Sequence, residues 1–189
     1  MWRTIQNYID VLRKVCNVLK IIPDTVMSDF EKAEKPALHT VFPSAKIIGC
    51  FFHYSQALVR NAGKHGILKD DGYESGLSAI KLLKSLAFLP KKLIEEGFEL
   101  ISKIIFKDCP YLQSFFNYYK KTWIDNFKPD SFCVFQEIYR TNNVSKKHNR
   151  ELRENLKKHT TIFIFSNTKS VFEVKRGIRN SGHEGKDVL

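Results

Sequence analysis

The feature that most constrains the fold is a nearly continuous apolar run at residues 45–52, which follows a turn at Pro43 and Ser44. A run this short and this apolar is typical of a strand covered on both faces, as in a parallel sheet. A β-like run at residues 25–28 precedes it, and residues 31–41 between the two carry apolar side chains at helical spacing. Because parallel strands need such a crossover, the sequence predicts a strand–helix–strand unit.

The crossover contains Pro36, which should either kink the helix or mark its true first turn. Apolar spacing also predicts helices at residues 3–20 and 53–64. From Glu74 the pattern is helical only, with helices at residues 110–123 and, rich in basic side chains, at 145–158. Residues 126–139 look irregular, and residues 161–165 could form a strand or a buried stub.

The predicted fold class is therefore α/β and mostly helical, with few parallel strands plus a helical region. The expected organisation is a strand–helix–strand core at residues 1–66, a helical region at 67–139, a basic helix with a C-terminal stub at 140–175, and a disordered tail at 176–189. Two strands are few for an open sheet, so we expect the sequence to start inside a larger fold and to leave a strand edge unpaired.

The chain is strongly basic. The 189 residues include 31 Lys and Arg against 20 Asp and Glu, a formal net charge of +11. Such a surplus favours nucleic acid or another polyanion as the partner, while a lysine-rich solvated surface is the alternative. Hydrophobic residues make up 43% of the chain, enough for a real core.

The four cysteines are scattered, without a C-x-x-C pair. No signal segment opens the chain, and no apolar run reaches the length of a membrane span. These observations predict a reduced, intracellular protein without a membrane partner, whose cysteines lie in the core.

Five motifs occur in order between about residues 5 and 158: MSDFEKA, VFPSAKIIGCFFHYSQALVR, LKSLAFLP, YYKKTWI and RTNN. In this order they resemble Mutator-like (MULE-type) transposases. The most specific are the D-F-E-x-A motif, which begins at Asp29, and the G-C-F-F-H-x-x-Q-A motif, which contains Cys50 and His53.

The resemblance implies a ribonuclease-H-like fold, of which this chain would hold a part, and an Asp-Asp-Glu triad that binds two Mg²⁺ ions and cleaves and joins DNA. Asp29 matches the second triad acid and would be a metal ligand. On its residue type alone, Asp29 could instead cap the following helix. The resemblance also suggests a nuclear location, with the cytoplasm as the alternative.

Cys50 and His53 match the C-x-x-H motif of the family. They look like half of a zinc site, but no other cysteine lies at ligand spacing. A buried Cys and a hydrogen-bonded His at a strand–helix junction is the favoured interpretation, and His53 could contact DNA. With residues 26–28 pairing in parallel with residues 47–51, we expect Asp29 and His53 to meet at the carboxyl ends of the strands.

The sequence departs from the family at the other two acids. The first acid would lie on a strand that precedes residue 1, and Lys146 stands where the third acid is expected. A cation there repels metal ions, so we expect no stably bound Mg²⁺ and no cleavage of DNA with Mg²⁺ or Mn²⁺.

Two functions remain open. The first is a transposase fragment that keeps DNA affinity through basic side chains, namely Lys146, Lys147, Arg150, Arg153, Lys157 and Lys158. The second is a helical interaction scaffold, or a gene fragment without a molecular role. An aromatic stripe at residues 115–123 could pack on another subunit, although such stripes are more often core. The sequence sets no oligomeric state.

Overall fold

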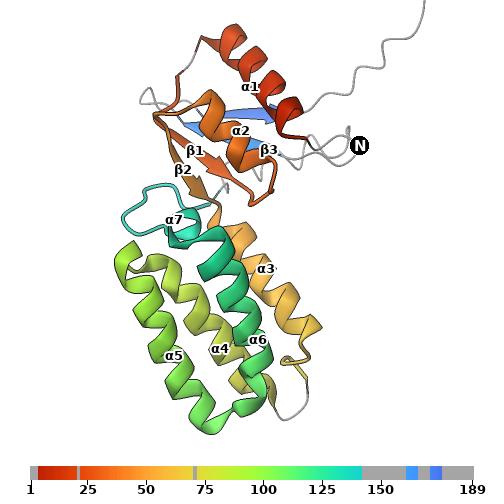
Figure 1. Ribbon diagram of the computed structural model, residues 1–189, viewed down its shortest axis with the longest axis vertical. Coiled ribbons are helices and arrows are strands. Elements are labelled where there is room, and N and C mark those ends of the chain that lie inside the picture. The colour runs from red at the N-terminus through yellow and green to blue at the C-terminus, as the bar shows by residue number, and fades with distance from the viewer. Residues whose placement is uncertain (1–3, 21, 70–71, 142–160, 166–170, 176–189) are drawn as a thin grey trace, which may run out of the picture.

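A computed structural model describes residues 4–20, 22–69, 72–141, 161–165 and 171–175. A small sheet carries two helices, and a helical bundle extends from one end of it (Figure 1). The α/β, mostly helical class is confirmed. No helix among these described residues has the length and apolar character needed to cross a membrane.

The predicted parallel unit is present. Strand β1 (Thr25–Ser28) pairs in parallel with β2 (Lys46–Gly49), and Val26 lies opposite Ile47. Helix α2 (Glu34–Val41) connects them and begins three residues later than predicted, so Pro36 lies in its first turn. Its N-cap residue is Ala33, and therefore the interpretation of Asp29 as the cap is wrong.

The sheet holds more strands than the sequence predicted. Strand β3 (Thr161–Phe165) pairs antiparallel with β1, and β4 (Val171–Lys175) pairs antiparallel with β3, giving the order β2-β1-β3-β4. The stub alternative for residues 161–165 is wrong, and so is the expectation of parallel strands only. Because β3 covers the second edge of β1, β1 has no unpaired edge.

Alternate side chains of β1 face opposite sides of the sheet, as the pleat requires. Val26 packs with Leu12 of α1 (Ile5–Leu19) and Leu38 of α2, whereas Met27 packs with Ile48 and Cys50. Helices α1 and α2 thus cover one face of the sheet. Residues 145–158, predicted as a basic helix, and the tail at 176–189 lie outside the described residues.

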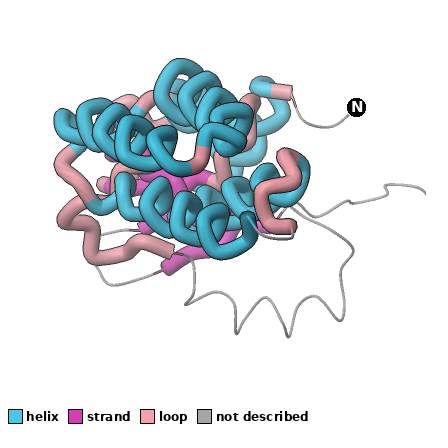
Figure 2. The backbone as a smooth tube through the Cα atoms, turned by 90° about the horizontal axis from the view of Figure 1, so that it is seen from below, coloured by secondary structure: helices cyan, strands magenta, loops and turns pink. Residues whose placement is uncertain are grey.

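Helix α3 (Phe51–Lys64) leads directly from β2 into the bundle. Seen from below in Figure 2, the long helices of the bundle lie side by side in front of the strands. The remaining elements of this region are α4 (Tyr73–Ser85), η2 (Leu86–Phe88), η3 (Lys91–Leu93), α5 (Ile94–Asp108), η4 (Pro110–Leu112), α6 (Gln113–Tyr119), the π-helical η5 (Lys120–Phe127) and α7 (Pro129–Phe132).

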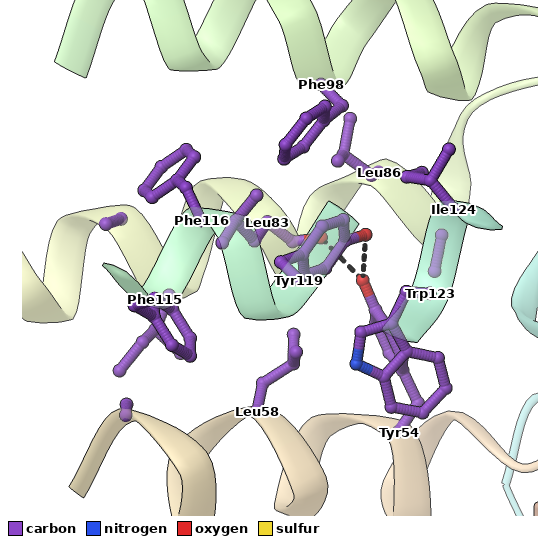
Figure 3. Packing of buried hydrophobic residues seen from close by; sticks show 14 of the residues in the cluster. Tyr54, Leu58, Leu83, Leu86, Phe98, Phe115, Phe116, Tyr119, Trp123 and Ile124 are labelled. Atoms are coloured by element: carbon purple, nitrogen blue, oxygen red, sulfur yellow. Dashed lines mark hydrogen bonds between the residues drawn. The ribbon is translucent and has the colours of Figure 1, made fainter. Parts of the chain in front are cut away.

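The aromatic stripe of α6 and η5 is core. Phe115, Phe116, Tyr119 and Trp123 are at most 2% exposed. Tyr54 of α3 donates its hydroxyl to Leu83 O at 2.7 Å, and its oxygen lies 2.7 Å from the Tyr119 hydroxyl (Figure 3). Because these side chains fill the bundle, they do not supply a docking face for another subunit.

Candidate functional site

The candidate site lies where the sheet meets the bundle. Asp29 follows β1 directly, and Cys50 follows β2 and is the N-cap residue of α3. The N–H of Cys50 donates to Ser28 O at 2.8 Å, which continues the parallel ladder beyond Gly49. The carboxyl ends of both strands are therefore locked together beside Asp29.

His53 is the third residue of α3 and reaches back to the end of β1. Its Nδ1 lies 2.9 Å from Asp29 Oδ1, and both side chains are partly buried. The expectation that Asp29 and His53 meet at the carboxyl ends of two parallel strands is confirmed.

The electrostatics of this group favour a charged histidine. Burial alone lowers the pKa of His53, but the hydrogen bonds to Asp29 and Cys50 and the negative charge of Asp29 outweigh it and raise the pKa from 6.5 to about 10. At neutral pH, His53 and Asp29 therefore form an ion pair.

The connection after Asp29 is strained. Phe30 has a φ of 69°, a left-handed conformation that a bulky residue rarely adopts. Its ring packs edge-on against Trp123 at 5.0 Å and against Phe127 at 5.5 Å between ring centroids. The bundle thus holds the turn that positions the Asp29 carboxylate.

Glu34 is a further acid near the site that sequence reasoning missed. It is completely buried at the start of α2. Burial raises its pKa most, the charge of Asp29 raises it further, and the net result is a pKa of about 8 despite opposing hydrogen bonds from the Asp29 backbone and Ser28. A signal existed: Glu34 falls on the i, i+3, i+4, i+7 stripe formed by Ala37, Leu38 and Val41.

A hollow of about 800 Å³ lies beside the site. Its lining includes the acid Glu31, the basic Lys32 just before α2, Lys35 and His39 of α2, and polar groups of η5 and α7. The amine of Lys35 bonds to Ser131 Oγ at 2.5 Å across the hollow. This surface can accept an anionic group.

Two chemistries can be compared for the group of Asp29, Cys50 and His53. A nucleophilic Cys–His–Asp triad needs a thiol that a substrate can reach, but Cys50 is completely buried. Metal binding needs donor atoms that converge, and those of the three residues all lie within 4.8 Å of one another. Metal coordination is the better fit.

The donor set does not suit the Mg²⁺ that the resemblance implies. Mg²⁺ prefers hard oxygen ligands, whereas this group offers one carboxylate, one imidazole and one thiol. The buried Glu34 is not part of the group of described residues whose donor atoms converge. No step of two-metal chemistry follows from these residues.

The remaining predicted residues, Lys146, Lys147, Arg150, Arg153, Lys157 and Lys158, lie outside the described residues. Comparisons of the chain with protein-family models, with curated proteins and with solved structures gave no match.

Proposed function

We propose that this chain is a non-catalytic relative of the MULE-type transposases, with part of a ribonuclease-H-like fold, and that it binds DNA. The observation that carries the proposal is the meeting of Asp29 with His53 of the C-x-x-H motif at the carboxyl ends of two parallel strands. These residues are 24 positions apart in the chain (53 − 29). The motif resemblance requires such a meeting, and a chance match of short motifs does not.

Two arguments support the loss of catalysis. The Asp29 carboxylate is engaged by His53 at 2.9 Å, so its charge is already compensated by a histidine. Lys146 occupies the position of the third acid. A two-metal mechanism needs several carboxylates that hold both ions close to the reacting phosphate, and of the Asp29 and Lys146 positions only Asp29 supplies one.

The charge supports DNA as the partner. Binding to the phosphate backbone needs positive side chains but no intact triad. The chain has a net charge of +11, and its basic side chains recur at residues 146–158. Lys32 and Lys35 add positive side chains at the hollow beside Asp29.

Fluorescence anisotropy with a labelled duplex of mixed sequence tests DNA binding, in salt from about 50 to 200 mM, where phosphate contacts weaken steeply. We expect binding with a negative slope of log K against log salt. Alanine at the six basic positions of residues 146–158 should make the slope less steep by up to about 0.9 for each lost contact.

The matched control replaces six exposed lysines of the bundle, which are Lys64, Lys81, Lys92, Lys103, Lys107 and Lys121. Both variants lose the same charge, so only the location differs. Equal slopes for the two variants would contradict the assignment of residues 146–158, and no binding at the lowest salt would contradict DNA binding itself. Metal-dependent nicking of a supercoiled plasmid that is lost in Asp29→Ala would contradict the absence of catalysis.

A further inference from the structure

The C-x-x-H motif supplies only two metal donors, and the fold supplies a third. Cys50 and His53 lie on the first turn of α3, while Asp29 comes from the end of β1. Among the described residues, these three form a group of His, Cys, Asp or Glu side chains whose donor atoms all lie within 4.8 Å of one another. The parallel pairing of β1 with β2 creates this convergence.

The spacing of the donor atoms is compatible with a tetrahedral centre. Zinc bonds of about 2.0–2.3 Å to O, N and S ligands place such ligands about 3.3–3.6 Å from one another. The observed 2.9 Å between Asp29 Oδ1 and His53 Nδ1 needs to open by a few tenths of an ångström, which small side-chain rotations allow. The backbone need not move, since the Cys50 N–H remains bonded to Ser28 O.

An ion can also reach the group. Cys50 is completely buried, but the side chains of Asp29 and His53 are 17% and 29% exposed. An ion would enter from the side of these two residues, and water would complete its coordination there. A site with three protein ligands and one open position is a familiar arrangement for zinc.

We propose that Asp29, Cys50 and His53 form a three-ligand site for Zn²⁺, which would join the end of β1 to the first turn of α3 and would release the protons of the Cys50 thiol and the His53 imidazolium to solvent. The inference goes beyond the proposed function, because it requires neither DNA binding nor the family resemblance. Thiolate and imidazole ligands select Zn²⁺ and other late transition metals over Mg²⁺. Since the ligands come from two elements, bound metal would also stabilise the fold by mass action.

Cobalt titration tests the proposal on the full chain after chelator treatment. We expect one equivalent of Co²⁺ to bind with a thiolate-to-metal charge-transfer band, and an equivalent of Zn²⁺ to remove the band. Excess Mg²⁺ should leave it unchanged. Cys50→Ser should abolish the band and weaken Zn²⁺ binding by more than the roughly 10–100-fold that loss of an outer-shell partner costs.

The controls are Cys109→Ser and His39→Gln, which change the same residue types outside the group. Both should bind Zn²⁺ as the unmodified chain does. Unchanged binding in Cys50→Ser, or loss of the band in Cys109→Ser, would overturn the proposal.

A second measurement needs no variant and therefore does not depend on the folding of Cys50→Ser. Zinc X-ray absorption of the loaded, unmodified chain should fit one sulfur neighbour and the remainder nitrogen or oxygen. A first shell without sulfur, or with more than one, would overturn the assignment. Either result would leave DNA binding untouched, so the two proposals fail separately.

Discussion

At the scale of single residues, Gly49 shows how closely the sheet and the bundle approach. A Cβ added at Gly49 would lie 2.2 Å from Phe30 Cζ and 2.2 Å from the backbone oxygen of Ser131. We expect Gly49→Ala to lower the free energy of unfolding by about 1–3 kcal/mol, because the backbone of α7 must shift. Chemical denaturation measures the change.

Gly63 provides the matched control for Gly49→Ala. It lies within α3, and nothing would lie within 4 Å of its added Cβ. Because alanine favours helix more than glycine does, Gly63→Ala should raise the free energy of unfolding by about 0.5–1 kcal/mol. Destabilisation by both substitutions to a similar degree would argue against a close contact at Gly49.

Glu34 should make stability depend on pH. Its folded pKa of about 8 exceeds the ordinary value of 4.5, so its contribution is fully present below 4.5 and is lost as the pH rises through 8. Glu34→Gln should remove this loss and raise stability at pH 8.5 relative to the unmodified chain by roughly 2–4 kcal/mol.

His53 contributes to the free energy of unfolding over a different pH range. This contribution is present below pH 6.5 and is lost as the pH rises through about 10, so it remains in Glu34→Gln. Urea denaturation of Glu34→Gln and of the unmodified chain at pH 5 and pH 8.5 separates the contribution of Glu34 from that of His53. The same pH dependence in Glu34→Gln and in the unmodified chain would show that Glu34 ionises normally.

At the scale of elements, the turn from β1 to α2 depends on the bundle. Phe30 combines a φ of 69° with ring contacts to Trp123 and Phe127 of η5. Phe30→Ala should lose the ring contacts and keep the strained backbone, whereas Phe30→Gly should lose the contacts and relieve the strain. We therefore expect Phe30→Gly to be more stable than Phe30→Ala by about 1 kcal/mol.

The reverse order would contradict this account, because glycine ordinarily costs more than alanine through the entropy of the unfolded chain. Thermal unfolding of the two variants at the same pH gives the comparison. Val59→Ala and Val59→Gly, at an exposed position within α3, should show the ordinary order.

Sequence reasoning succeeded where the signal was local. The short apolar runs at β1 and β2 and the helical spacing between them were enough to predict the parallel pair and the position of Asp29 and His53. It gave β3 as one of two alternatives but missed its pairing with β1 and the strand β4, because pairing between segments so distant in the chain leaves no local pattern. It also failed for Phe30, since nothing in a D-F-E sequence indicates a positive φ.

At the scale of the whole molecule, two large hydrophobic clusters are distinct from a small third cluster, formed by Met27, Ile48 and Cys50, that contains the thiol of the candidate site. One of the large clusters packs α1 and α2 on the sheet, and the other fills the bundle around Tyr54 and Trp123. Cys50 and Phe51 lead the chain from β2 into α3 of the bundle. The ion pair of Asp29 with His53 links the end of β1 to the same helix. The sequence predicted that Asp29 and His53 meet, but it did not predict that the donor atom of Cys50 converges with theirs.

The central claim is that Asp29 is committed to His53, and a double-mutant cycle of Asp29→Asn and His53→Gln tests it most directly. Unfolding is measured at pH 7 with a chelator present, so that metal does not contribute. Because the ion pair is partly buried and its atoms lie 2.9 Å apart, we predict a coupling free energy of about 1–3 kcal/mol. Additive effects, within about 0.3 kcal/mol, would contradict the claim.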